Sequence, residues 1–503
     1  MIVAVTIDSD GRGSTMDTAI DLVNAVNDKF WYLIIVLLVG LGLYFSIRSR
    51  FVQVRLLREM FRVITDKPAD LADGRPGISS FRAFAISAAS RVGTGNIAGV
   101  AIAISVGGPG AVFWMWAMAI VGGATAFVES TLGQLYKVRD RDSFRGGPAY
   151  YMQYGLGRRW MGAVFAVVIT VTYGFVFVAV QSNSIADAVD TSVGGSSDTV
   201  NVIVGVVVAA LTAAVIFGGV RRISSVSQVV VPVVAGIYLL LGLIVVLMNI
   251  GRVPEMLTLI VENAFGIEEV VGGGVGAAIM QGVRRGLFSN EAGMGSAPNA
   301  GATASISHPA KQGLVQSLGV YFDTLLVCTT TAFIILLANP DYGTESGASL
   351  TQVALAEHLG EWTIHFLTVA LFFLAFTSVI GNYYYGESNI GFLTPSKGAL
   401  QGFRALVVLC AFGGAVGSLP LIWSLADLSM GVMATINLVA IAPLSVLAFR
   451  LMRHYTDQRR RGMDPVFNRS DMPDIRGIQA WDDTPSWAER ATADHSPTPA
   501  REG

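Results

Sequence analysis

Long apolar stretches follow one another along this chain, each bounded by charged or polar residues. Most are longer than a strand and show no alternation of apolar and polar positions, so a helix is the expected structure. Roughly 20 mostly apolar residues cross a bilayer, and a helix satisfies its own backbone hydrogen bonds there. We predict an all-α integral membrane protein with eleven transmembrane helices, at residues 28–47, 83–107, 110–136, 160–188, 199–219, 223–249, 270–304, 312–338, 362–392, 400–420 and 423–449.

Lysine and arginine gather in alternate loops between these stretches. Residues 48–82 carry eight of them and residues 137–159 carry six, whereas the opposite side carries Arg12, Lys29 and Arg252. Basic loops face the cytoplasm in most membrane proteins. We therefore predict a multi-pass protein of the plasma (inner) membrane with its amino terminus outside and its carboxyl terminus in the cytoplasm, which agrees with an odd number of spans.

Composition divides the chain into an extracytoplasmic segment at 1–27, a transmembrane domain at 28–450 and a cytoplasmic tail at 451–503. Residues 48–64 interleave basic and apolar positions, which is typical of a helix at the anionic membrane interface, although a solvated linker has the same composition. From residue 454 onward the tail is rich in Arg, Asp, Pro and Ser, so we expect it to be mostly disordered.

The overall composition narrows the class of protein further. Of 503 residues, 52% are hydrophobic and only 14% are charged, and the mean hydropathy is +0.57, which nearly excludes a soluble enzyme. The net charge of −2 argues against a nucleic-acid partner. Cys328 and Cys410 lie in apolar stretches and the five histidines lack metal-ligand spacing, so we expect no resident cofactor. No HExxH or GxSxG motif of an enzyme is present in the sequence.

Two of the predicted spans are interrupted by glycine and charge at mid-membrane depth. The span at 83–107 contains SRVGTGN at 90–96, and the span at 270–304 contains RRGLFSNEAGMG at 284–295. A glycine costs about 1 kcal/mol in a helix interior, and a charge at the bilayer centre costs about 2.5–3.5 kcal/mol. Non-helical backbone persists at this depth only where protein or a water-filled cavity satisfies it. We favour a functional site over the alternative, two closely packed glycine-rich helices.

The two interrupted spans lie five spans apart in the chain. Because five is an odd number, the second copy of a five-span repeat would enter the membrane from the opposite side to the first. We predict inverted repeats of spans two to six and seven to eleven, with the first span as an addition; paired discontinuous helices in such halves indicate a secondary transporter. A half-helix beginning near Asn96 presents free N–H groups to a carboxylate, and the carbonyls ending the preceding half-helix suit sodium. The arrangement fits a zwitterionic amino acid with a co-transported cation.

Four stretches resemble the alanine/glycine:cation symporter family. They are Arg91–Gly99, Phe144–Met152, Arg285–Pro298 and Tyr384–Glu387, and the resemblance extends over about residues 28–450. It implies the leucine-transporter (LeuT) fold, a 5+5 inverted repeat with one extra amino-terminal span. It also implies sodium-coupled uptake of small neutral amino acids by alternating access around a fixed site.

The resemblance also implies a set of substrate-binding residues. They are Thr94, Gly95, Asn96, Gln181, Phe288, Ser289, Asn290 and Asn382. The first three would hold the carboxylate, and the residues of the seventh span would line the pocket. Gln181 would add a polar wall, although a hydrogen bond between helices explains it equally well. Many members of the family carry tryptophan where this chain has Asn382, which leaves the size limit of the pocket open.

For sodium, the resemblance implies four ligands from two spans. They are the carbonyls of Ala89 and Val92 and the hydroxyls of Thr377 and Ser378. The alternative for the two hydroxyl residues is that small side chains allow close helix contact at this point.

Several charged residues inside the predicted spans need partners, because an unpaired charge is too costly there. They are Arg91, Arg284, Arg285, Glu129, Glu291, Asp323 and Glu387. We expect the arginines to pair with these acids, and the sequence does not assign the pairs. Arg91 fits a cytoplasmic gate and a static salt bridge equally well. Asp323 is either a cation or proton site or a partnered structural carboxylate.

Together these features predict a symporter that couples inward sodium movement to uptake of alanine, glycine or a similar amino acid. Its expected partners are that amino acid, sodium and the lipid bilayer; its oligomeric state is left open. The alternative within transport is a proton-coupled carrier of another small organic solute on the same fold. A channel is a third possibility, which the pair of interrupted spans makes less favourable.

Overall fold

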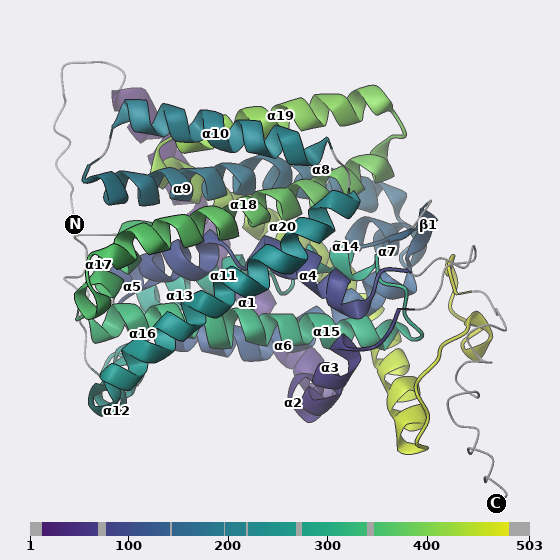
Figure 1. The fold of residues 1–503 in the computed structure, drawn as a ribbon. Helices are drawn as coiled ribbons and strands as arrows, with labels where there is room; N and C mark the ends of the chain where they lie inside the picture. The colour runs from purple at the N-terminus through teal and green to yellow at the C-terminus, as the bar shows by residue number, and fades with distance from the viewer. Residues whose placement is uncertain are drawn as a thin grey trace, which may run out of the picture.

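The computed structural model describes residues 13–68, 77–140, 143–195, 197–217, 220–267, 274–339 and 347–481. Helices run side by side through one bundle, with short helices and loops at its two ends (Figure 1). Within the described residues, nine helical segments are long and apolar enough to cross a membrane, and a tenth is a pair of helices bent by 54°. This agrees with the predicted all-α membrane protein.

Every predicted span corresponds to helix in the structure. Seven are single helices: α1 (Gly13–Arg48), α6 (Gly110–Leu135), α10 (Asp198–Ile216), α11 (Val220–Met248), α18 (Trp362–Leu393), α19 (Lys397–Ala415) and α20 (Leu419–Arg460). Two contain a π-helical segment: α8 (Arg159–Val171), η2 (Thr172–Phe177) and α9 (Val178–Val193), and α15 (Pro309–Val320), η4 (Tyr321–Cys328) and α16 (Thr329–Leu337). Two are broken: α4 (Ser80–Arg91), η1 (Gly95–Gly99) and α5 (Val100–Gly107), and α13 (Gly274–Asn290) and α14 (Ala297–Gly301).

The apolar pattern did not predict several short elements at the ends of the bundle. They are α2 (Val52–Arg55), α3 (Leu57–Ile64), α7 (Pro148–Tyr154), η3 (Ile250–Arg252), α12 (Val253–Ala264), α17 (Ala348–Leu359), η5 (Arg469–Asp471) and the antiparallel hairpin of β1 (Val138–Asp140) and β2 (Ser143–Arg145). The predicted interfacial helix at 48–64 is therefore two short helices. Arg50 and Phe51, with φ of 56° and 53°, turn the chain between α1 and α2.

Helices from the two halves of the chain pack against each other in matching order. α6 packs on α15, α9 packs on α18, and α10 packs on α19. At the breaks, α5 contacts α13 and α4 contacts α14. The close approach uses small residues: a Cβ at Gly381 of α18 would lie 3.0 Å from the backbone nitrogen of Ser90, so only glycine lets these two spans meet there.

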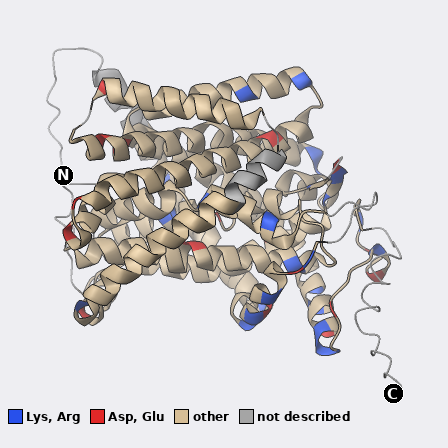
Figure 2. Cartoon of the chain, viewed as in Figure 1, with Lys and Arg blue, Asp and Glu red and all other residues tan. Residues whose placement is uncertain are grey.

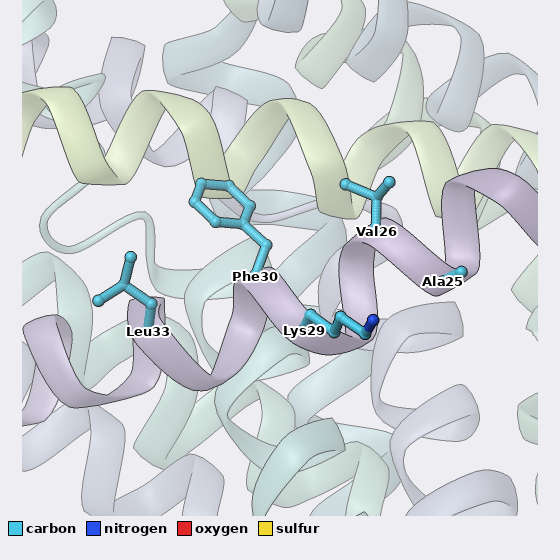
Figure 3. Close-up of a pocket in the computed structure, with 5 residues that line it drawn as sticks. All are labelled: Ala25, Val26, Lys29, Phe30 and Leu33. Carbon is cyan, nitrogen blue, oxygen red and sulfur yellow. The ribbon is translucent and has the colours of Figure 1, made fainter.

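The outer helices present apolar side chains outward, as a lipid-facing surface requires. Only 28% of the most apolar window of α10, α11 and α19 is buried inside the protein. A shallow hollow on this outer surface is lined by five residues of α1, with Phe30 directed toward α20 (Figure 3): Ala25, Val26, Lys29, Phe30 and Leu33. Val26 and Leu33 are 47% and 52% exposed, so the hollow faces outward and is not the predicted binding site.

Charged side chains gather at the two ends of the bundle, and Lys and Arg favour one of them (Figure 2). We call it the basic end; it carries α2, α3, the β1–β2 hairpin, α7 and the loop before α15. The opposite end carries α12 and α17.

The carboxyl-terminal segment differs from the prediction. α20 continues to Arg460, and residues 461–481 fold back onto the basic end, where Phe467 and Trp481 are only 2% and 5% exposed. The prediction of a mostly disordered tail therefore does not hold for residues 451–481. That prediction relied on the polar composition of the segment, but a few apolar residues between the polar ones are enough to anchor it. The buried ones are Phe467, Met472, Ile475, Ile478 and Trp481. Residues 482–503 of the predicted tail lie outside the described residues.

Candidate functional site

The first break separates α4 from η1 at residues 92–94. The freed backbone groups are satisfied by side chains: Gly93 N donates to Asn96 Oδ1 at 3.0 Å, and Thr94 N donates to Gln181 Oε1 at 3.3 Å. Gly95 opens η1, where an added Cβ would lie 2.8 Å from the ring of Phe288. Glycine is required because the backbone passes directly beneath this aromatic side chain.

The second break lies between Asn290 and Ala297, later than the sequence pattern indicated. Arg284 and Arg285 remain helical in α13, and the chain leaves the helix at Glu291, whose φ is 57°. Gly293 and Gly295 follow with φ of 96° and 80°, a conformation that glycine adopts without strain. The predicted residues Phe288, Ser289 and Asn290 therefore occupy the last helical turn before the break.

Glu129 of α6 supports the second break from one side. Gly293 N and Gly295 N donate to its carboxylate at 3.3 and 3.1 Å, and Asn437 Nδ2 of α20 donates to it at 2.8 Å. Among the described residues, no arginine or lysine forms a salt bridge with Glu129. Glu129 was one of four acids that the sequence left open as partners of the arginines; here backbone N–H groups and the Asn437 amide satisfy its carboxylate instead.

The two breaks meet at Asn96. Its Nδ2 lies 2.7 Å from Asp323 Oδ1 of η4 and 3.1 Å from Ser289 Oγ of α13, and the Ser289 hydroxyl also donates to Asp323. Asp323 is 1% exposed and is satisfied here by hydrogen bonds from uncharged groups. The structure thus brings Asn96, Ser289 and Asp323 together from three spans that are distant in sequence.

Other predicted residues surround the same point. Gly93 lies against Gln181 and Ser378, and the Asn382 amide lies 2.7 Å from Ser90 Oγ. Thr377 and Ser378 are buried and donate to the carbonyl of Leu374 in their own helix, at 2.8 and 3.1 Å. Within the described part of the chain, three buried polar atoms of the predicted substrate and sodium residues have no hydrogen-bond partner: Thr94 Oγ1, Asn290 Nδ2 and Asn382 Nδ2.

Arg91 ends α4 and faces the second break. Its Nε lies 3.9 Å from Glu291 Oε2, and both side chains are 1% exposed. Glu291 also accepts from the hydroxyls of Ser90 at 2.9 Å and Ser296 at 2.6 Å. This pair, one of those the sequence left open, therefore ties the first break to the second.

The remaining charged pairs use partners that the sequence reading missed. Arg285 Nη2 lies 2.5 Å from both oxygens of Asp427 in α20, and Arg284 lies 3.8 Å from Asp427 and 3.3 Å from Asp28. Glu387 pairs with Arg404 at 3.3 Å. Asp427 lies 142 positions after Arg285 in an otherwise ordinary apolar span, so no local pattern marks it.

Aromatic rings form a continuous row beside the breaks. Centroid distances are 5.1 Å from Tyr385 to Tyr173, 4.7 Å from Tyr173 to Phe177 and 4.7 Å from Phe177 to Phe288. Phe288 is 4.9 Å from Trp423, over whose ring the Arg285 guanidinium lies at 4.8 Å. The Arg285–Asp427 pair therefore covers the Phe288 side of the site.

The described residues contain no group of three or more His, Cys, Asp or Glu side chains that would hold a metal ion. The oxygens and amides around Asn96 instead suit a small polar solute and a weakly bound cation.

Comparison with known proteins gives consistent matches over nearly the whole chain. The profile described as the sodium:alanine symporter family matches residues 16–469. An amino-acid carrier protein, AlsT, of Bacillus subtilis is 53% identical over 92% of this chain and 97% of its own length. A probable sodium/glutamine symporter, GlnT, of the same organism is 50% identical over 92% and 95%. The sodium/alanine symporter AgcS of Methanococcus maripaludis is 38% identical over 88% and 98%.

Proposed function

Because this chain belongs to the sodium:alanine symporter family, we propose that it moves a small neutral amino acid inward together with sodium, by alternating access around the two breaks. The chain is a transporter, not an enzyme. The observation that carries the site assignment is the meeting of both broken spans at Asn96, Ser289 and Asp323. Membrane-embedded backbone that departs from a helix is the characteristic binding element of secondary transporters.

The proposed topology has eleven spans, with the basic end in the cytoplasm of the plasma membrane and the amino terminus outside. The gathering of Lys and Arg at one end supports this orientation. Beyond the nine helices and the bent pair, the remaining proposed span is the seventh, α13 with α14; α13 alone has 17 residues, and part of the predicted span at 270–304 lies outside the described residues.

The proposed architecture is the LeuT-type inverted repeat, in which spans two to six match spans seven to eleven. The packing of α6 on α15, α9 on α18 and α10 on α19 supports it, because corresponding members of two related halves would meet about a common axis. The position of a break in the first span of each half adds to this support.

We assign the substrate to the space beside Thr94, Asn290 and Asn382, whose free polar atoms point to an absent polar partner. In this proposal Phe288, which lies over Gly95 and packs on Phe177 and Trp423, forms the apolar side of the space and limits the substrate to a small side chain. Alanine and glycine are therefore the proposed substrates. Glutamine, after which the Bacillus subtilis relative GlnT is named, is the competitor to test.

Sodium is assigned to the carbonyls of Ala89 and Val92 and the hydroxyls of Thr377 and Ser378. The approach of Gly93 to Ser378 supports this site, because it brings the first break against α18. Both buried hydroxyls donate their proton to the Leu374 carbonyl of their own helix, so their oxygen lone pairs remain available to a hard cation.

Asp323 is proposed as a second cation or proton site. Arg91 is paired with Glu291, and the contacts of Asp323 among the described residues are uncharged groups of Asn96, Ser289 and Thr324, so one buried acid near the breaks has no counter-charge. A neutral zwitterion does not correct this imbalance, whereas a co-transported cation does. The Arg285–Asp427 pair is proposed as the gate on the opposite side of Phe288, and Arg91–Glu291 as the gate toward the basic end.

The test is uptake of labelled alanine, glycine and glutamine into proteoliposomes with an inward sodium gradient. We expect alanine and glycine to accumulate and glutamine to compete weakly. Replacing sodium with choline at fixed pH should abolish uptake. Uptake driven by an inward proton gradient in choline would instead favour the proton-coupled alternative, and failure of both small amino acids would overturn the substrate assignment.

A further inference from the structure

Residues 461–481 extend from α20 and cross the basic end of the bundle (Figure 1). Two aromatic side chains anchor the segment. Trp481 Nε1 donates to Gln134 O at 3.0 Å, and the Trp481 ring lies 4.6 Å from Lys137 Nζ. Phe467 packs on His308 and Trp481, with ring centroids 5.8 and 5.5 Å apart, and its backbone N donates to Ser307 O at 2.8 Å.

The residues beneath these anchors hold the joint between the two broken spans. Gln134 Nε2 and Lys137 Nζ each donate to Ala304 O at 3.0 Å. Ala304 pairs with Ile78 in an isolated parallel bridge, and Ser305 N donates to Ile78 O at 2.9 Å. Ile78 precedes α4, and Ala304 follows α14, so the basic-side halves of the two broken spans are joined here.

Charged contacts surround the anchors but are more exposed. Asp464 lies 2.9 Å from Lys311 and 3.3 Å from Arg62, and its side chain is 47% exposed. Asp474 lies 2.6 Å from Arg450 and is 61% exposed. Exposed ion pairs contribute little, whereas buried aromatic side chains dominate an interface. Phe467 and Trp481 therefore account for most of the attachment.

We propose that residues 461–481 are a latch that holds the basic-side exit of the transport path closed. The proposal rests on alternating access in the proposed function, because the exit opens only when Ala304 and Ser305 separate from Ile78. Phe467 of the latch bonds Ser307 and so connects it to the end of α20. Trp481 of the latch covers Gln134 and Lys137, which both donate to the Ala304 carbonyl. Release of the latch shifts the population toward the state that is open at the basic end.

Cys328 reports this opening without any substrate, because its Sγ lies 3.0 Å from Ser289 Oγ inside the site. In a Cys410→Ser background, Trp481→Ala is compared with Arg476→Ala, a change at an exposed position of the same segment. A membrane-impermeant thiol reagent is applied to the basic end. We expect Trp481→Ala to be labelled about tenfold faster, equivalent to a shift of about 1.4 kcal/mol. Equal rates in the two variants, including no labelling of either, would overturn the latch.

A second test, which does not depend on whether Trp481→Ala folds, is to cross-link the latch in its attached position. Ser307 Oγ donates to Pro465 O at 2.8 Å, so Ser307→Cys and Pro465→Cys can be joined by a short bifunctional thiol reagent. We expect alanine uptake by the linked double variant to fall at least tenfold below that of each single variant treated identically. Undiminished uptake by the linked protein would contradict the proposal. Absence of sodium-driven uptake by the unmodified protein would instead remove the proposed function, and the labelling comparison would still test the latch.

Discussion

At the scale of single residues, Asn96 has the most connected side chain of the site. It satisfies Gly93 N with its oxygen and contacts Asp323 and Ser289 with its nitrogen. Its amide therefore holds the first break in shape and joins it to two other spans. Because both the oxygen and the nitrogen of this amide form hydrogen bonds, removing the side chain or exchanging the positions of the two atoms would leave buried polar groups without partners.

We expect Asn96→Ala to raise the KM for alanine at least tenfold, because the break loses its internal acceptor. Asn249→Ala is the matched control, since Asn249 lies at the end of α11 and donates to Val245 O of its own helix at 2.9 Å. Initial rates of uptake at varied alanine concentration measure the effect. An unchanged KM in Asn96→Ala would exclude this residue from the substrate site.

Thr377 tests the sodium site separately. Thr377→Ala should raise the sodium concentration for half-maximal uptake several-fold, because one oxygen ligand is lost, while the alanine KM at saturating sodium stays close to that of the unchanged protein. Thr377→Ser retains the hydroxyl and should restore the sodium requirement. If the serine variant behaves like the alanine variant, the methyl group and helix packing explain the effect, and the sodium assignment is wrong.

At the scale of secondary-structure elements, apolar length was sufficient to predict where the long helices lie but not where they end. The eleven predicted stretches all contain helix, because twenty apolar residues have no other stable form in lipid. The short helices α7, α12 and α17 were missed, since they lie at the bundle ends and carry mixed side chains. Gln181, Ser289 and Asn96 were predicted to belong to one site and lie together, whereas the Arg285–Asp427 pair joins two helices 142 positions apart in sequence, which no local pattern encodes.

The Arg285–Asp427 pair joins α13 to α20, and its side chains are 3% and 8% exposed. Asp427→Asn leaves a buried guanidinium without a counter-charge, so we expect the folded state to lose roughly 3–5 kcal/mol. Thermal unfolding of the purified protein measures the loss. Asp457→Asn removes the acid of an exposed pair with Arg460 and should leave the melting temperature unchanged. Equal behaviour of both variants would mean that the buried pair has no structural importance.

The latch should weaken in acid, because His308 lies beneath Phe467 at the start of α15. Burial, followed by the nearby His454 and Lys311, lowers the pKa of His308 well below its ordinary value of 6.5. When the latch is released, His308 regains its ordinary pKa and binds a proton more readily than it does in the latched state. The attachment is therefore complete above pH 6.5 and weakens as the pH falls below 6.5. Tyr455 also packs on His308, with ring centroids 5.3 Å apart, while Asp471 lies against His454, Asp66 and Asp464 lie against Lys311, and Arg62 lies against Asp464.

Limited proteolysis of the carboxyl-terminal segment at pH 7.5, 6.5 and 5.5 measures this release. We expect cleavage to accelerate between pH 6.5 and 5.5. His308→Asn keeps an acceptor for Ala310 N, which the imidazole Nδ1 provides at 3.1 Å, but cannot titrate. This variant should lose the acceleration. An identical pH profile in both proteins would show that His308 is not the group that controls the release.

At the scale of the whole molecule, a buried acid without a basic partner determines which ion must be transported together with the substrate. Glu129 is neutralised in effect by backbone N–H groups, and Glu291 by Arg91 and two hydroxyls. Asp323 has hydrogen bonds but no basic side chain in contact among the described residues. A carboxylate that touches both broken spans is therefore positioned to require a cation in the loaded state and to lose it when the spans separate.

We expect Asp323→Asn to transport one fewer positive charge per alanine than the unchanged protein, because asparagine preserves the shape but needs no cation. The reversal potential of alanine-coupled current in proteoliposomes measures the charge carried. Parallel counts of labelled sodium and of proton uptake per alanine identify which cation is lost. Asp457→Asn, at an exposed position in α20, controls for surface charge. The same charge per alanine in Asp323→Asn would show that Asp323 only braces Asn96 and Ser289, and that the coupling cation binds elsewhere.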